Sequence, residues 1–244
     1  MTKVAKARGR RPSDVALTRE QIVTAALDIL TVKGIEAFSV RDLAKVLGVY
    51  PAAIYHHIST KNELLSEVVA FALRELEPPS EGGSWQDWLR QLFIRYRAAV
   101  QQTPAVATLI GARIVSNGGV GPDLIEHILA TLIRAGFDER NIVQAFNVVI
   151  AAKVGFVTLE FASLPDEADE FREMMRSRIN TVNVESTPLL ARYLPLLSNK
   201  AFMLRWDGGD VAPLDESFEA YTSVVLHGLE TMLENYNRQI IFDH

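Results

Sequence analysis

The chain has 244 residues, 48% of them hydrophobic, a formal net charge of −5 and no cysteine. This length suits one large domain or a small domain joined to a larger one, and the missing cysteines exclude disulfides and thiolate metal sites. The basic N-terminus lacks the continuous apolar segment of a signal peptide, so the expected compartment is the cytoplasm.

The charge is distributed unevenly along the chain. Residues 1–61 carry ten Lys and Arg against five Asp and Glu, whereas residues 62–244 carry fifteen against twenty-five. A basic head followed by an acidic body is typical of a protein that presents its head to nucleic acid. Ordinary surface variation is the alternative explanation.

Residues 1–17 combine basic side chains with little apolar content, and their cations are Lys3, Lys6, Arg8, Arg10 and Arg11. This composition predicts a flexible basic arm. Such an arm could follow DNA phosphates or enter a minor groove, as homeodomain arms do. A solvated tail without function is an equal alternative.

The first predicted helix begins after Thr18. Thr18 and Gln21 have the spacing of a capping box, and Leu17 with Ile22 that of a hydrophobic staple. Apolar residues then recur at helical spacing until Gly34, which is expected to end the helix after Lys33.

Two short helices follow, separated by a tight turn. Ser39 and Asp42 predict a second capped helix, and Gly48 can take the positive φ that ends it. Pro51 suits the first turn of the next helix, which Ile54 and Ile58 would hold against the core. Two short helices joined in this way predict a helix-turn-helix, whose second helix enters the DNA major groove.

The segment from Gly48 to Leu65 reads GVYPAAIYHHISTKNELL and resembles the recognition-helix signature of the tetracycline-repressor (TetR) family. The residues at family spacing are Gly48, Tyr55, His57, Lys61 and Leu64. A weaker resemblance to the tetracycline-repressor class continues through Ser84–Leu92, Ala135–Asn141 and Val224–Leu233. The resemblance implies a homodimer that binds a double-stranded DNA operator and a small-molecule effector.

The resemblance also implies roles for individual residues in DNA binding. Arg41 and Lys61 match positions that hold phosphates, and Arg41 also has the reach for a base edge. Tyr55 and His57 match positions that contact the DNA backbone. The remaining candidates are Tyr50, Pro51, Ala52 and Ala53. The last three replace polar base-reading residues, which leaves contacts between alanine and thymine methyls but no bidentate hydrogen bond.

The rest of the chain predicts further helices and no strands, so the expected fold is all-α. A fourth helix should run from Thr60 to Pro78–Pro79, and the segment 78–83 marks a boundary between a DNA-binding domain at 18–77 and a larger domain at 84–244. The later helices are expected at about 84–102, 103–117, 122–136, 138–163, 187–197 and 217–233. Residues 167–178 predict a solvated helix or a mobile loop, and residues 205–213 a loop.

The segment Asn141–Ala162 is apolar on nearly every face. Its length would permit a membrane span, but polar side chains recur within it and no basic flank anchors it. A helix buried in a helical assembly is therefore expected, with no membrane contact. Ser217–Leu233 has a similar character, and the resemblance implies that both segments meet their copies in a four-helix dimer interface.

No catalytic or metal site is predicted. His56 and His57 are adjacent, so on a helix their side chains diverge by about 100° and cannot chelate one ion together. Phosphate-loop, zinc-protease and nucleophile-elbow motifs are all absent from the sequence. We therefore expect a protein that is not an enzyme and needs no cofactor.

The expected effector pocket differs from that of the tetracycline repressor. By the resemblance, Leu92 and Tyr96 replace a drug-binding asparagine and a phenylalanine, Ile110 replaces a magnesium-binding histidine, and Arg113 replaces a threonine near the metal. Asn147 is a further candidate ligand contact. Leu92 and Ile110 could equally be core residues. The set implies a mainly hydrophobic effector, aromatic or weakly acidic, bound without a metal.

Three functions remain open from the sequence. The first is a ligand-responsive repressor, the second a DNA-binding regulator or architectural protein without a small ligand, and the third a helical enzyme with a helix-turn-helix. The absence of a polar catalytic constellation disfavours the third.

Overall fold

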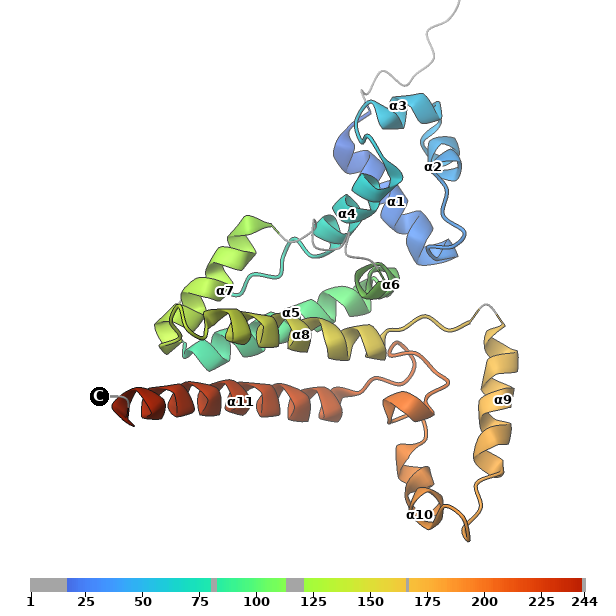
Figure 1. Cartoon of the computed structure of the whole chain (residues 1–244). Coiled ribbons are helices and arrows are strands. Elements are labelled where there is room, and N and C mark those ends of the chain that lie inside the picture. Colours follow the sequence, from blue (N-terminus) through green and yellow to red (C-terminus); the bar gives the residue numbers. More distant parts are fainter. Residues whose placement is uncertain (1–16, 80–82, 113–120, 166, 243–244) are drawn as a thin grey trace, which may run out of the picture.

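The computed structural model describes residues 17–79, 83–112, 121–165 and 167–242, and within these ranges every regular element is helical (Figure 1). The prediction of an all-α fold is confirmed. The basic arm 1–16 lies outside the described residues. In chain order the α-helices are α1 (Arg19–Lys33), α2 (Val40–Leu47), α3 (Pro51–Tyr55), α4 (Lys61–Ala72), α5 (Trp85–Gln102), α6 (Ala105–Ala112), α7 (Pro122–Ala135), α8 (Ile142–Glu160), α9 (Ala168–Asn180), α10 (Pro188–Leu197) and α11 (Asp215–Phe242).

Helices α1–α4 form the N-terminal unit, and their ends follow the predicted signals. Thr18 and Gln21 make the capping box of α1 in both directions. Gly48 ends α2 with φ 67°, which is the left-handed conformation that glycine adopts at least cost. Pro51 occupies the first turn of α3, while Ile54 and Ile58 are 1% exposed.

Three boundaries differ from the prediction. Helix α11 begins at Asp215 and continues to Phe242, well past the expected end at 233. Helix α4 ends at Ala72, well before Pro78, because the chain turns at Leu73 and buries both Leu73 and Leu76. Helix α8 begins at Ile142, not at Asp138. Asp138 lies in a preceding turn, where its N–H donates to Asn141 Oδ1 and its carbonyl accepts the first N–H of the helix.

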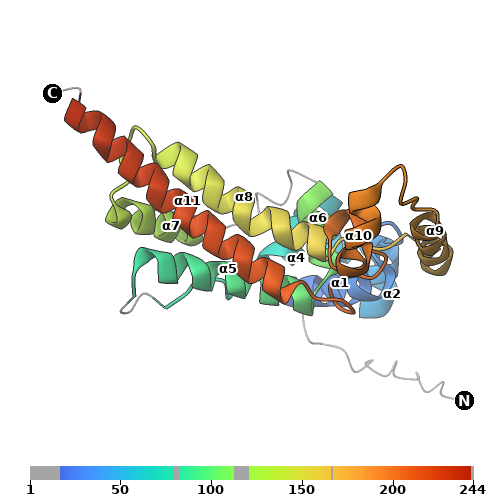
Figure 2. The same cartoon turned by 90° about the horizontal axis from the view of Figure 1, so that it is seen from below.

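The C-terminal unit is a bundle of α5, α7, α8 and α11, shown along its length in Figure 2. Helix α8 lies at its centre and packs on α5, α6, α7 and α11. Helix α6 also packs on α4, which makes it a contact between the N-terminal unit and the bundle. Any motion passed from one unit to the other therefore has a direct route through α6 and α4.

One charged cluster closes the end of the bundle where α11 begins. Arg97 donates to both carboxylate oxygens of Glu160, at 2.8 and 2.6 Å, and lies 2.7 Å from a carboxylate oxygen of Asp215. The N–H of Leu214 also donates to Glu160, at 2.8 Å. Because the Glu160 side chain is fully buried, this cluster ties α5, α8 and α11 together through one carboxylate.

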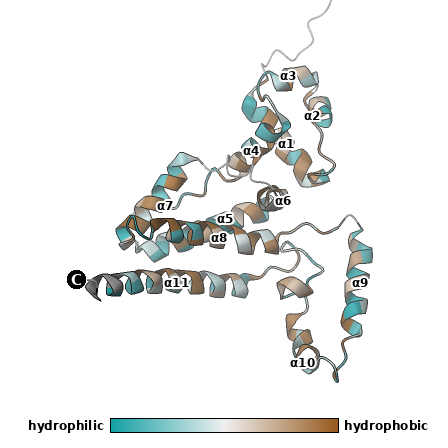
Figure 3. Ribbon diagram, in the orientation of Figure 1, coloured by the Kyte–Doolittle hydropathy of each residue, from teal (hydrophilic) through white to brown (hydrophobic). Residues whose placement is uncertain are grey.

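Helices α9 and α10 project from the bundle (Figure 1) and bury none of their residues. The open alternative for residues 167–178 is thus settled as a helix, while residues 205–213 form the predicted loop. Figure 3 shows polar residues predominating on α9 and apolar ones on α10.

Helix α8 is long and apolar enough to cross a membrane by length and composition alone. In this structure it packs inside the bundle on one side and leaves an apolar stripe of small residues exposed on the other. A second such stripe runs along α11. The exposed residues, spaced four apart, are Ala151, Gly155 and Leu159 on α8 and Ala220, Val224 and Gly228 on α11. This spacing places each trio on one helix face, as a helix–helix contact requires.

Candidate DNA-binding surface and effector site

The recognition helix α3 lies at the tip of the molecule, remote from the bundle (Figure 1). Tyr50, the residue that caps it, is 85% exposed, and Tyr55 at its end is 46% exposed. Ala52 is also exposed, whereas Pro51, Ala53 and His57 are partly covered. The structure thus brings the predicted α3 residues onto one protruding surface.

The two cations predicted to hold phosphates differ in their surroundings. Arg41, in the first turn of α2, is exposed and has no ion pair among the described residues. Lys61 donates from Nζ to the carbonyl oxygen of Phe38 at 2.9 Å, and its ammonium lies 5.4 Å from the centroid of the Phe38 ring. Lys61 therefore also braces the start of α2 and has only its remaining N–H donors for a phosphate.

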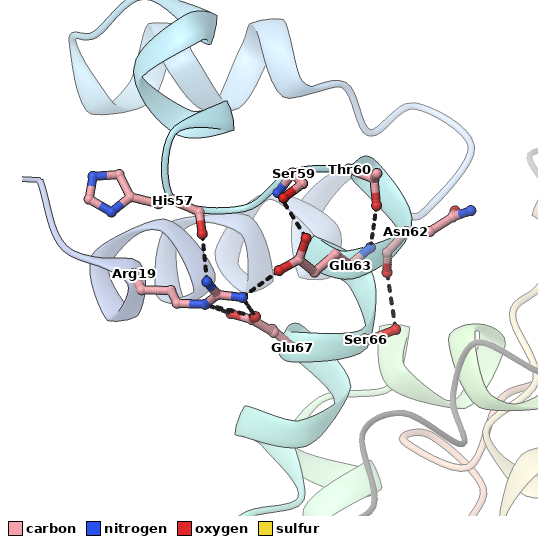
Figure 4. A network of polar contacts seen from close by, with 8 residues as sticks. All are labelled: Arg19, His57, Ser59, Thr60, Asn62, Glu63, Ser66 and Glu67. Atoms are coloured by element: carbon pink, nitrogen blue, oxygen red, sulfur yellow. Dashed lines mark hydrogen bonds and ion pairs between the residues drawn. The ribbon is translucent and has the colours of Figure 1, made fainter.

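Arg19 holds the end of the recognition helix in place, a role that the sequence analysis missed (Figure 4). It donates to the His57 carbonyl oxygen at 2.6 Å and pairs with the carboxylates of Glu63 and Glu67 on α4. The carboxylates of Glu67 and Glu63 raise the pKa of Arg19, while the N–H of Ser59 and the Arg19 guanidinium lower the pKa of Glu63. The clamp joins α1, the turn after α3, and α4.

The predicted effector residues do not all converge within one protomer. Leu92 and Tyr96 on α5 are buried, at 0% and 1% exposure, and Ile110 on α6 is partly buried against the same core. Asn147 lies on the exposed face of α8. Arg113 lies outside the described residues. For Leu92 and Ile110, a place in the hydrophobic core was the alternative to a role in ligand binding. Burial in the core does not exclude contact with a ligand.

A buried cation faces Tyr96 from α8. Lys153 is 3% exposed, and its Nζ lies 4.9 Å from the centroid of the Tyr96 ring. No carboxylate pairs with it among the described residues. Burial lowers the pKa of Lys153 to about 8 and raises that of the Tyr96 phenol, so Tyr96 stays neutral at physiological pH. One signal for this site is visible in the sequence, because Lys153 interrupts an apolar segment.

Comparison with known proteins identifies both units. Residues 22–68 match the model of the bacterial regulatory proteins of the tetR family. Residues 77–233 match that of the tetracyclin repressor-like C-terminal domain. The chain belongs to the TetR family.

The relatives agree with this assignment. The class A tetracycline repressor of Escherichia coli transposon 1721 is 30% identical over 211 residues, which are 85% of this chain and 88% of that protein. An HTH-type transcriptional regulator of Saccharopolyspora erythraea is 30% identical over 148 residues, or 59% of this chain and 61% of the relative. The crystal structure of ActR from Streptomyces coelicolor in complex with actinorhodin has the same fold, with a TM-score of 0.67, 22% identity and coverage of 88% and 96%.

Membership in the TetR family identifies the chain as a DNA-binding transcriptional regulator and not an enzyme. The first match begins at Ile22, the first buried residue of α1, and the second match ends within α11. The two units seen in the structure therefore correspond to the DNA-binding and regulatory parts of a TetR-family protein.

Arg41 provides the clearest test of phosphate contact in this TetR-family regulator, because it has no ion pair in the described part of the chain. We expect Arg41→Ala to weaken binding to specific and nonspecific duplexes alike. The slope of log K against log salt should fall by about 0.9, since one phosphate contact is lost. Fluorescence anisotropy across a salt series measures both the affinity and its salt dependence. An unchanged slope with altered sequence preference would assign Arg41 to a base edge instead.

Lys153→Met should stabilise the free protein. Below pH 8 Lys153 is charged in both the folded and unfolded states, and burying this charge costs about 3 kcal/mol for a pKa that falls from 10.5 to about 8. Between pH 8 and 10.5 the folded state loses its proton while the unfolded state keeps it, so stability of the wild type rises with pH. Denaturant unfolding should show a gain for Lys153→Met at pH 7 that disappears by about pH 10.5. A loss of stability at pH 7 would show that other groups in the folded protein compensate the buried charge of Lys153.

Proposed function

We propose that this protein is a homodimeric repressor that binds a palindromic operator in the cytoplasm and is released by a small, mainly hydrophobic effector. The observation that carries the proposal is the connection of two units through α4 and α6. One unit presents the exposed α3 surface, and the other holds a buried polar pair, Tyr96 and Lys153, in an apolar bundle. Tetracycline repressors are among its relatives, and the similar structure of ActR was solved in complex with actinorhodin.

The apolar stripes on α8 and α11 support a dimer. A Cβ atom at Gly155 or at Gly228 would meet nothing within 4 Å, so the space beside each glycine is open for a partner helix. Two helices from each protomer would then form a four-helix interface. In such a dimer the two α3 helices should lie about 34–36 Å apart, the spacing of successive major grooves on one DNA face.

Release requires that the effector favour the state that cannot bind DNA. A shift from mostly bound to mostly free takes about 5.5 kcal/mol of differential affinity. Ile110 offers no ligand to a metal ion, and Leu92 and Tyr96 supply apolar surface, so we propose that the effector acts without magnesium. Arg113 and Asn147 remain candidate contacts.

The test begins with selection of an operator from random-sequence duplexes by the wild-type protein. A small-molecule screen then measures operator release by fluorescence anisotropy, with and without EDTA. We expect a palindromic operator and an aromatic effector whose action is unchanged by EDTA. Light scattering should show a dimer at micromolar concentration. A stable monomer, or release that EDTA abolishes and magnesium restores, would contradict the proposal.

A further inference from the structure

Lys153 is an uncompensated cation inside the regulatory bundle. Its side chain is 3% exposed, and it has neither an ion pair nor a hydrogen bond among the described residues. The other buried charge on α8, Glu160, is engaged by Arg97, which also pairs with Asp215, and by the N–H of Leu214. A buried charge without a partner is strongly unfavourable, and the quadrupole of the Tyr96 ring offsets only part of its cost.

Other polar groups in the bundle also lack partners. The hydroxyl of Tyr96 makes no hydrogen bond among the described residues, and the buried hydroxyl of Thr222 on α11 has none either. Tyr96 on α5 and Lys153 on α8 thus place two unpaired donors at one level of the bundle.

The groups around this level are apolar. Leu92 and Phe93 precede Tyr96 by one helical turn, share its face of α5 and are buried. Tyr96 and Lys153 are themselves covered by their neighbours, at 1% and 3% exposure. A ligand that reaches Lys153 must therefore displace side chains or helices, and its binding is coupled to a conformational change.

We propose that Lys153 is the anchor for an anionic group on the effector, with Tyr96 as a second donor, so that the effector is an aromatic or other apolar carboxylate. This inference rests on the proposed function, because it places the effector in the regulatory bundle. The carboxylate supplies the charge partner that the free protein lacks. Leu92 and Phe93 contact the apolar body of the ligand.

The test compares a charged probe with a neutral probe of the same shape, 2-naphthoate and 2-naphthamide. Calorimetry on the full-length dimer measures both affinities. A charge-assisted hydrogen bond is stronger than a neutral one, so we expect a preference for the carboxylate of about tenfold or more in the wild type. In Lys153→Met the preference should fall to about one, while Tyr96→Phe should weaken carboxylate binding less than Lys153→Met does.

Lys200→Met is the matched control, because residues 84–244 contain only two lysines and Lys200 is exposed. It should leave the preference unchanged. Equal affinities of the wild type for both probes, no carboxylate binding, or a preference that survives Lys153→Met would overturn the inference.

Operator release separates this inference from the proposed function. If 2-naphthoate binds through Lys153 but does not release the operator, the anion site stands and the assignment of this site to effector response fails. If the effector found by screening is neutral and acts equally on Lys153→Met, the repressor function stands and the anion site is wrong.

Discussion

Arg97→Met should destabilise the protein by about 3–5 kcal/mol, because it leaves the Glu160 carboxylate buried without its cation. The N–H of Leu214 remains as a donor to Glu160, but one neutral donor does not balance a full charge. The substitution also removes the contact between α5 and Asp215 at the start of α11. Denaturant unfolding at pH 7 measures the loss.

Two further variants make this prediction specific. The double variant Arg97→Met/Glu160→Met should recover most of the stability, because an apolar pair replaces the ion pair without an orphaned charge. Arg140→Met removes an arginine whose partner, Asp138, is exposed, and should leave stability unchanged. A small effect of Arg97→Met, equal to that of Arg140→Met, would show that the cluster is solvated.

Ala52→Glu should weaken operator binding on the order of 100-fold, because the exposed face of α3 would carry a carboxylate toward a polyanion. Charges of like sign placed against each other at an interface cost several kcal/mol. Stability should change little, since Ala52 is exposed and glutamate is a good helix former. Anisotropy with the selected operator measures the loss.

Lys200→Gln is the control for net charge, because it also makes the chain more negative by one unit but lies far along the sequence in the turn after α10. Its affinity for the operator should remain within about twofold of the wild type, since charges beyond a Debye length are largely screened. Equal losses in the two variants would mean that overall charge, and not the α3 surface, determines DNA binding.

The helix-turn-helix was predictable because its signals are local. Ser39, Gly48 and Pro51 act on backbone conformation within a few residues, and the structure has helix ends at each of them. Where a local signal competed with packing, the prediction was wrong. Pro78 is a strong helix breaker, yet α4 stops earlier because Leu73 and Leu76 turn into the core.

The contacts that organise the candidate sites were beyond the reach of sequence patterns. Arg19 meets Glu67 across 48 positions, and Arg97 meets Glu160 across 63. In the sequence, Arg19 cannot be distinguished from any other charged residue in the first turn of a helix. Lys153 and Glu160 are both visible in the sequence as charges in an apolar helix. Glu160 is paired and Lys153 is not, and this difference depends on which residues of α5 and α11 face them.

The separation of the two recognition helices tests the central claim most directly. The side chain of Asn62 points away from the Arg19 clamp in Figure 4. Because the chain has no cysteine, Asn62→Cys gives one spin-label site per protomer beside α3. Pulsed electron paramagnetic resonance measures the distance between the two labels. We predict one narrow distance on the operator, consistent with α3 helices about 34–36 Å apart, and a shift away from it when the effector binds. A single distance that is the same free, on the operator and with the effector, or no distance between protomers at all, would contradict a dimeric repressor controlled by a ligand.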